Sequence, residues 1–216
     1  MTVGRRSFAF AVTAFVFTSR VHAESANDGR EKLSGAALDT LLADIKRARQ
    51  GMRTLVASFT QERKIALLAT TVKSTGKMAF LAPDRLRWEL EPPDDVVYVV
   101  GPEGLSYRTR SSRATMPAGS AKVARGLRDL RALLTGDIAD LAKSYTLTAS
   151  RSADDVALEG IAKEKSDDIR SFTLTIDKAL VLPLRARLIE GKADSIDIVF
   201  SHALANTPVD AASMRP

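Results

Sequence analysis

Few residues in this chain have the chemistry of a catalyst or a metal ligand. The 216 residues include no cysteine and only two histidines, His22 and His202. Metal centres need clusters of His, Cys, Asp or Glu, and catalytic nucleophiles need a neighbouring base. Two histidines near opposite ends of the chain offer neither arrangement. The composition therefore argues against a metal site, a thiol nucleophile and Ser-His or Cys-His catalysis, and we expect no cofactor.

Carboxylate doublets are the next candidates, because two close acids can share general acid–base work. Three such doublets occur: Asp94-Asp95, Asp154-Asp155 and Asp167-Asp168. Each lies between two stretches of strand-like sequence, where aspartate is a common turn residue. We interpret all three doublets as solvated turn acids.

A serine and a lysine at nucleophile spacing complete the candidates. Ser74 and Lys77 form S-x-x-K, which penicillin-recognising enzymes use together with S-D-N and K-T-G motifs. Neither of those two motifs occurs in the sequence. Gly76-Lys77 also lacks the earlier glycine and the following serine or threonine of a phosphate-binding loop. We therefore predict a binding protein and not an enzyme.

The N-terminal residues have the pattern of an export signal. Two arginines precede an apolar run from Phe8 to Thr18, and Val21-His22-Ala23 supplies a small-residue cleavage site. The apolar run is too short to span a membrane. We predict a signal peptide over residues 1–23, cleaved after Ala23, and leave open whether it uses the Sec or the twin-arginine route.

The mature chain after cleavage is predicted to be a single domain over residues 24–216, with loose ends at 24–32 and about 207–216. The cleavage site has no cysteine to carry lipid, and no later segment is apolar enough to span a bilayer. Three arginines leave with the signal, so the formal charge falls from +6 to +3. That charge is too small to indicate nucleic acid. We expect a soluble periplasmic protein that is a monomer.

The stretch from Gly76 to Glu91 indicates the element around which the mature chain is built. Apolar residues alternate with other residues before the Pro83-Asp84 corner and again after it, and the second row contains Trp88, the only tryptophan. A period of two places each apolar row on one face of a strand. Pro83 suits a turn, because it cannot donate a ladder hydrogen bond. We predict a β-hairpin with one apolar face.

Apolar residues at helical spacing predict helices before and after this hairpin. The first helix covers about 38–48, the second is marked by Val123, Leu127, Leu130 and Leu134, and a short sequel contains Ile138 and Leu141. Residues 110–119 are polar and are predicted to form a loop. Strands are predicted over most of the rest, at 56–75, 96–100, 105–109, 144–150, 156–162, 171–177, 184–190 and 194–200.

Short spacings without crossover helices imply an antiparallel meander of about ten strands. A single layer of that many strands curls, and the helical segments can then cover its mouth. We predict an α+β fold: an open antiparallel half β-barrel covered by helices.

Several motifs occur in an order that resembles a known family. Phe59-Thr60-Gln61 comes first, and the motifs that follow it are Gly76–Phe80, Ala82-Pro83, Leu86-Arg87-Trp88, the valine strand at 96–100 and Leu105-Ser106-Tyr107. The segment 206–210 is similar to a late segment of the same family. The chain thus resembles the periplasmic outer-membrane lipoprotein carriers, the LolA family, and it does so most distinctively from Phe59 to Tyr107.

The resemblance implies a helical lid over an apolar cavity that takes acyl chains. A carrier of this type accepts a lipoprotein from an inner-membrane transporter and passes it to an outer-membrane acceptor. The candidate lipid-binding residues are then Phe59, Met78, Phe80, Leu86, Trp88, Leu90, Tyr98, Leu127, Leu130 and Leu134. Ordinary core packing is the alternative interpretation of the same residues, and both interpretations stay open.

One position departs from the family pattern. Characterised carriers have an arginine directly before the proline of the central corner, tied to cavity closing and release, and this chain has Ala82 there. Arg85 and Arg87 lie on the strand face opposite Trp88, so they do not simply replace it. The cargo therefore stays open between lipoproteins and a related lipid. An alternative function is an envelope sensor or scaffold that binds a partner protein or a lipid signal.

Overall fold

The computed structural model describes residues 29–116, 122–135, 138–164, 169–191 and 193–216. Within these residues twelve strands form one sheet, in the order β1-β8-β9-β10-β11-β12-β2-β3-β4-β5-β6-β7. The end strands β1 and β7 each have one neighbour, so the sheet is open, as the sequence predicts. The predicted signal peptide, residues 1–23, lies outside the described residues.

Two antiparallel meanders meet at the β12–β2 pair to form this sheet. One meander runs from β8 to β12 and the other from β2 to β7. The strands are β1 (Glu31–Leu33), β2 (Thr54–Ile65), β3 (Thr70–Leu81), β4 (Arg85–Leu90), β5 (Val96–Gly101), β6 (Gly104–Arg108), β7 (Arg113–Met116), β8 (Tyr145–Arg151), β9 (Asp155–Ala162), β10 (Ile169–Asp177), β11 (Pro183–Glu190) and β12 (Asp194–Ala205).

The register of the central strands follows from their alternation. Phe59 pairs with Gly76 and Met78 pairs with Trp88, so these apolar residues share one face of the sheet. We call it the inner face, and the opposite one the outer face. Leu86 also points inward, because it pairs with Phe80. The predicted hairpin with its corner at Pro83 is confirmed.

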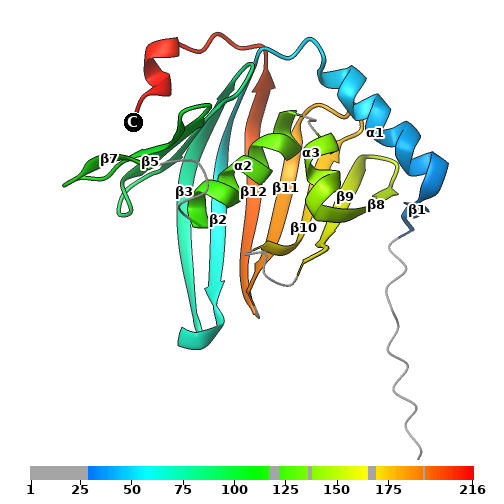
Figure 1. Ribbon diagram of the computed structural model, residues 1–216, viewed down its shortest axis with the longest axis horizontal. Helices are drawn as coiled ribbons and strands as arrows, with labels where there is room; N and C mark the ends of the chain where they lie inside the picture. Colours follow the sequence, from blue (N-terminus) through cyan, green and yellow to red (C-terminus); the bar gives the residue numbers. More distant parts are fainter. Residues whose placement is uncertain (1–28, 117–121, 136–137, 165–168, 192) are drawn as a thin grey trace, which may run out of the picture.

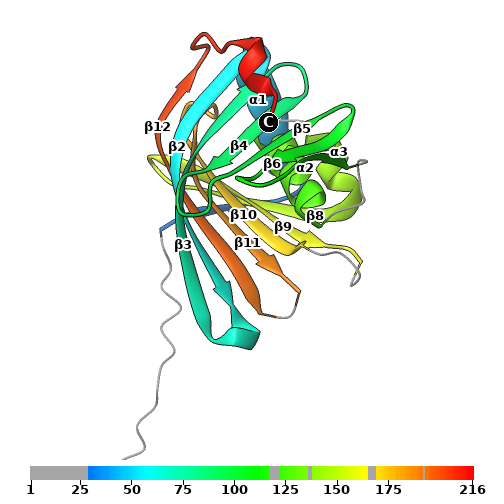
Figure 2. The ribbon, with the colours of Figure 1, turned by 90° about the vertical axis from the view of Figure 1, so that its left-hand side faces the viewer.

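Three α-helices pack on the inner face (Figure 1 and Figure 2): α1 (Gly35–Arg49), α2 (Lys122–Thr135) and α3 (Ile138–Ser144). The apolar side of α1 is buried through Leu41 and Ile45, and that of α2 through Leu130 and Leu134. These residues join the inner-face side chains in one hydrophobic core. Burial of an amphipathic stripe supplies most of the stability of such helices. The helices predicted at these positions are confirmed.

Two segments predicted to be irregular form edge strands instead. β1 lies partly in the leader 24–32 and pairs with β8, and β7 lies in the predicted loop 110–119 and pairs with β6. The prediction of about ten strands is therefore too low, and a single meander is wrong because β12 lies beside β2. Strands of three and four residues carry too little alternation to be recognised.

The C-terminal segment is also ordered, although the sequence predicts a loose end from about residue 207. A short 3₁₀ helix, η2 (Ala211–Met214), packs on β4. Met214 is 2% exposed, and Arg87 Nη1 donates to the carbonyl oxygens of Ser213 and Arg215, each at 3.0 Å. One buried methionine and two backbone acceptors produce no periodic pattern in the sequence. The sequence therefore predicts a loose polar end although the segment is packed on the sheet.

Candidate functional site

A cavity of about 150 Å³ lies between α2 and the inner face of the sheet. Strands β2, β4, β5, β11 and β12 form its wall, and α2 covers one side of it. The lining residues are Gln61, Arg63, Trp88, Leu90, Tyr98, Gly126, Leu127, Leu130, Leu188, Glu190, Ile196 and Ile198. Seven of the twelve are apolar leucine, isoleucine or tryptophan side chains, so the cavity suits an apolar ligand.

Trp88 on β4 organises the apolar wall. It is 4% exposed and stacks on Phe59 of β2, with ring centroids 3.9 Å apart and an interplanar angle of 22°. Phe200 of β12 meets the indole edge-on at 6.3 Å. Stacked and edge-on aromatic contacts hold a ring in one orientation. The indole therefore presents a fixed apolar surface to the cavity.

Gly76 leaves the space that the Phe59 ring occupies. The two residues are cross-strand partners on β3 and β2. A Cβ atom at residue 76 would overlap the Phe59 ring and the backbone carbonyl oxygen of Glu89. Only glycine permits that close an approach. The stack of Phe59 on Trp88 therefore depends on the missing side chain at Gly76.

Polar groups gather where the inner face of β2 continues beyond Phe59. Arg63 Nη2 and Glu190 Oε2 form an ion pair at 3.0 Å, and Gln61 and Tyr98 line the same cavity. Arg63 Nε is buried without a hydrogen-bond partner. Burial raises the pKa of Tyr98, and the nearby Arg63 charge opposes that rise. The cavity thus combines a long apolar wall with one polar end.

The ten predicted lipid-binding residues fall into two groups. Five of them line the cavity: Trp88, Leu90, Tyr98, Leu127 and Leu130. The other five are buried in the hydrophobic core and lie outside the cavity lining: Phe59, Met78, Phe80, Leu86 and Leu134. Cavity lining and core packing, the two interpretations left open by the sequence, therefore each apply to half of the set.

Seven lining residues are missing from the predicted set, namely Gln61, Arg63, Gly126, Leu188, Glu190, Ile196 and Ile198. Leu188, Ile196 and Ile198 belong to predicted strands, and their alternation is a signal that was available in the sequence. Arg63 and Glu190 gave no such signal, because 127 positions separate the two members of the ion pair.

Two arginines connect α2 to its neighbours. Arg49, at the end of α1, donates from Nη1 to the carbonyl oxygens of Leu133 and Leu134, near the end of α2. Arg131 on α2 donates from Nη1 to the carbonyl oxygen of Asp84 in the β3–β4 corner, at 3.2 Å. Burial lowers the pKa of Arg49 to about 10, so the guanidinium keeps its charge at pH 7. Charged donors to carbonyls are among the stronger hydrogen bonds in proteins.

The same contacts lie near the corner where the family has its arginine. Arg85 pairs with Glu103, and Arg87 pairs with Glu89, both through short ion pairs on the outer face. Neither arginine therefore replaces the family's arginine, whose position is occupied here by Ala82. Within the described residues, Arg131 provides the side-chain hydrogen bond from α2 to this corner.

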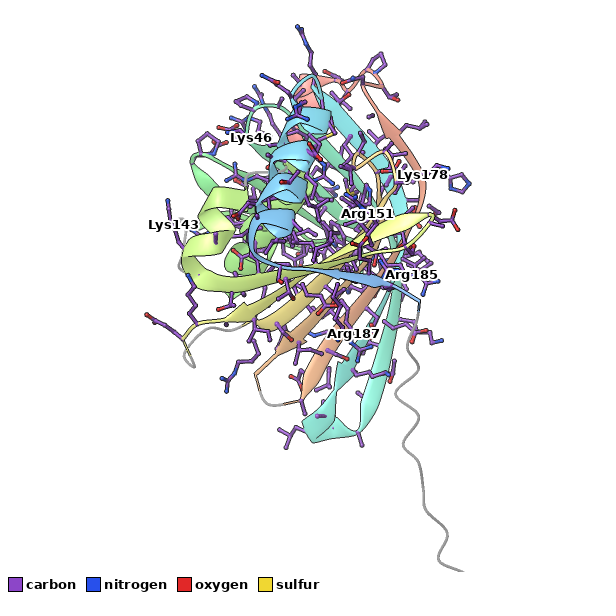
Figure 3. All side chains as sticks on the ribbon, turned by 90° about the vertical axis from the view of Figure 1, so that its right-hand side faces the viewer. Lys46, Lys143, Arg151, Lys178, Arg185 and Arg187 are labelled. Carbon is purple, nitrogen blue, oxygen red and sulfur yellow. The ribbon has the colours of Figure 1, made fainter. Side chains whose placement is uncertain are left out.

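A wider hollow of about 710 Å³ separates α1, α2 and α3 on the other side of α2. Its cationic lining residues are Lys46, Arg47, Arg49 and Arg131. Figure 3 shows Lys46 on α1, facing the same side of the molecule as Lys143 of α3. Arg47 is paired with Asp44, and Arg49 and Arg131 are used by the backbone contacts described above.

The two described carboxylate doublets, Asp94-Asp95 and Asp154-Asp155, are not among the residues that line the cavity. Asp94 accepts a hydrogen bond from the Ser74 hydroxyl, Asp95 pairs with Arg110 at 2.9 Å, and Asp155 pairs with Arg30. The doublet Asp167-Asp168 lies outside the described residues.

Metal-binding chemistry is missing from the part of the chain that the structure describes. No group of three or more His, Cys, Asp or Glu side chains is close enough there to hold a metal ion. His202 is exposed at an irregularity in β12. None of the described helices has the length and apolarity needed to cross a membrane.

A sequence comparison places these features in a family. The family model described as "Outer membrane lipoprotein carrier protein LolA" matches residues 50–214, which include all of the cavity lining. The resemblance inferred from the motifs between Phe59 and Tyr107 is thereby confirmed, and it extends over most of the chain. No curated protein matches the sequence.

Several solved structures are similar in fold at low sequence identity. A LolA superfamily protein from Nitrosomonas europaea is 11% identical, with 82% of this chain and 97% of that chain covered and a TM-score of 0.43. The lipoprotein LppX of Mycobacterium tuberculosis is 14% identical, with coverage of 80% and 98% and a TM-score of 0.42. The MucA/MucB complex of Pseudomonas aeruginosa matches at 16% identity, over 82% of this chain and 60% of that chain, with a TM-score of 0.48.

Proposed function

The chain belongs to the LolA family of outer membrane lipoprotein carrier proteins, and from this membership we propose that it is a periplasmic carrier. It binds the acyl chains of lipoproteins, or of a related lipid, in the cavity under α2 and carries them from the inner to the outer membrane. Its partners are then an inner-membrane transporter and an outer-membrane acceptor. The observation that supports this proposal most is the apolar cavity beside Trp88.

An acyl chain needs such a carrier because transfer of each methylene group from an apolar site into water costs about 0.8 kcal/mol of free energy. A chain of a dozen carbons therefore does not cross an aqueous space unaided. The side chains that replace its membrane environment here are Trp88, Leu127 and Leu130, with Ile196 and Ile198 on the facing strands.

The volume of the cavity implies that loading moves α2. A space of about 150 Å³ holds a group the size of benzene. A long acyl chain needs more room, so we propose that α2 is a lid that lies on the sheet in the empty protein and moves away in the loaded one. The hydrogen bonds of Arg49 and Arg131 would favour the closed position.

The test is a titration of delipidated protein with an acyl chain that carries a bromine quencher. Trp88 is the only tryptophan, so its fluorescence reports the cavity alone. We expect saturable quenching, and an affinity at least about tenfold weaker in Leu127→Ser, since a buried leucine contributes about 1.5–3 kcal/mol. The matched control is Ile161→Ser, because Ile161 is 64% exposed on the outer face.

The proposal would be wrong if no quenching is seen and if protein purified from its own envelope also contains no acyl lipid. Mass spectrometry of that native protein also identifies the cargo. The two measurements are independent, because one uses an added probe and the other uses the lipid that the cell supplies.

We also propose a binding role without catalysis. A carrier must return its cargo chemically unchanged, so the proposal assigns the lining residues to binding alone.

A second candidate function is an envelope sensor or scaffold that binds a partner protein. The observation that favours it is the tip of the β2–β3 hairpin, where Leu67 is 93% exposed and Leu68 is 66% exposed. Adjacent exposed leucines at a protruding tip are a common feature of contact surfaces.

A further inference from the structure

Three polar side chains at one end of the cavity have hydrogen-bonding capacity that the protein itself does not use. Arg63 Nε is buried and has no partner. Within the described residues no hydrogen bond engages the Gln61 amide or the Tyr98 hydroxyl, although both residues line the cavity. A buried donor without a partner, such as Arg63 Nε, is rare in proteins, and because Arg63 lines the cavity a ligand bound there can supply the acceptor.

The sheet register places two of the three residues on neighbouring inward positions of β2, and the third lines the same cavity from β5. Gln61 and Arg63 are two positions apart on β2, so both lie on the inner face, opposite Ile198 and Ile196 of β12. Tyr98 on β5 is near enough to Arg63 for its charge to influence the tyrosine pKa. Along the inner face of β2 the side chains therefore change from apolar to polar, and a ligand with an apolar tail and a polar group fits that gradient.

An ion pair contributes one positive and one negative charge to this end of the cavity. Arg63 Nη2 lies 3.0 Å from Glu190 Oε2, and the Glu190 side chain is 10% exposed. The two charges of this pair offset each other, and the Asp94 carboxylate adds a negative charge near Tyr98. A carboxylate on the ligand would be attracted by Arg63 and repelled by Glu190, which lines the same cavity. A neutral carbonyl oxygen accepts hydrogen bonds from the free donors and meets no such repulsion.

We infer that the Gln61–Arg63–Tyr98 end of the cavity binds the carbonyl oxygen of an ester- or amide-linked acyl chain, in preference to a free fatty acid. This inference rests on the proposed function, since it assumes that the apolar wall holds the chain. Each of the three groups is a hydrogen-bond donor on the cavity lining, and a carbonyl oxygen has two lone pairs that accept from such donors. Glu190 has the role of a selector, because its charge cancels the attraction that Arg63 would have for a carboxylate.

The experiment compares decanoate with N-methyl decanamide at pH 7, each in competition with the brominated acyl probe read out by Trp88. The two ligands have the same alkyl chain and differ in the charge of the polar group. We expect the amide to bind roughly tenfold more tightly, which is the scale of one hydrogen bond to a charged group. Tyr98→Phe should weaken the amide several-fold, because it removes one of the donors.

Glu190→Gln supplies the decisive variant. It keeps the shape of the side chain but leaves the Arg63 charge without its partner, so the preference for the amide should fall at least about tenfold or reverse. The matched control is Asp197→Asn. Asp197 pairs with Arg187 at 3.1 Å on the outer face, and Figure 3 shows Arg187 on β11, beside Arg185.

Equal or tighter binding of decanoate to the unmodified protein overturns the inference, and so does an unchanged preference in Glu190→Gln. These outcomes leave the proposed function intact, because the chain still binds. If neither ligand competes with the probe and the probe itself does not bind, the proposed function fails together with the inference. The comparison in the unmodified protein can overturn the inference even if a variant does not fold.

Discussion

At the scale of single residues, the aromatic wall of the cavity depends on one missing side chain. Phe59 lies across Gly76 and stacks on Trp88. Gly160 permits a similar approach of Phe172 in the other meander, where a Cβ atom would also overlap the ring. Aromatic rings packed on cross-strand glycines are therefore a repeated means of filling the inner face.

The first prediction concerns Gly76→Ala. The added methyl overlaps both the Phe59 ring and the Glu89 carbonyl oxygen, so the strands or the ring must shift. We expect a loss of about 1–3 kcal/mol in the free energy of unfolding, the usual scale of overpacking. Urea denaturation measures that loss, and a change in Trp88 emission in the folded state would report the disturbed stack.

Gly51→Ala is the control for this prediction. Nothing lies within 4 Å of a Cβ atom at residue 51, and its φ is not positive. The substitution should leave stability unchanged or raise it by up to about 1 kcal/mol through the unfolded state. Equal effects of the two substitutions would contradict the overlap argument.

At the scale of elements, the position of α2 decides whether the cavity is open or closed. Both contacts lie in the C-terminal half of α2: Arg131 joins it to the β3–β4 corner, and Arg49 joins its last turn to α1. The corner itself carries Ala82, so in this chain the cations that hold the helix come from α1 and from α2 itself. Removing one of them should shift the helix toward its open position.

The second prediction concerns Arg131→Gln. Loss of the hydrogen bond to the Asp84 carbonyl oxygen should speed entry of the brominated acyl chain roughly tenfold, measured as stopped-flow quenching of Trp88. Arg187→Gln is the control, since it removes an outer-face guanidinium of the same type. An entry rate that is the same in both variants and in the unmodified protein would show that Arg131 does not limit opening.

At the scale of the whole molecule, one hairpin reaches beyond the rest of the sheet. β2 and β3 stay paired up to Ile65 and Thr70, whereas β4 accompanies β3 only as far as Gly76, and Figure 2 shows the resulting projection. Ala66 N–H donates to Asp194 at 2.9 Å, which fastens the base of the tip to β12. The exposed leucines are thus presented on a supported arm at the edge of the molecule.

The third prediction uses this arm to separate the two candidate functions. Replacing Leu67 and Leu68 together by serine should leave folding and acyl-probe affinity unchanged, because both side chains are exposed and outside the cavity. A sensor or scaffold should lose its complex with the external segment of a membrane protein in pull-downs from envelope extracts. A carrier without that role would form no such complex in either version.

Much of the fold was predictable because local periodicity determines it. Alternation in Met78, Phe80, Leu86 and Trp88 predicted the central hairpin, and helical spacing in Leu127, Leu130 and Leu134 predicted α2. The edge strands β1 and β7 were missed because their pairing is imposed by β8 and β6, not by any pattern of their own.

The site was predictable only in part, for a related reason. Alternation assigns Leu86 and Trp88 to the same face, yet Trp88 lines the cavity and Leu86 does not. Which apolar residue borders empty space depends on how far α2 lies from each strand. The residue pattern of a single strand does not predict the distance between that strand and α2.

The sequence by itself determined most of the strands, the three α-helices and the family of this protein, because each depends on residues near one another in the chain or on their order along it. The tertiary structure alone decided the rest. It selected the cavity-lining residues, linked α2 to the sheet through Arg49 and Arg131, and paired Arg63 with Glu190 across 127 positions. These contacts depend on distances that exist only after the two meanders have joined at β12 and β2.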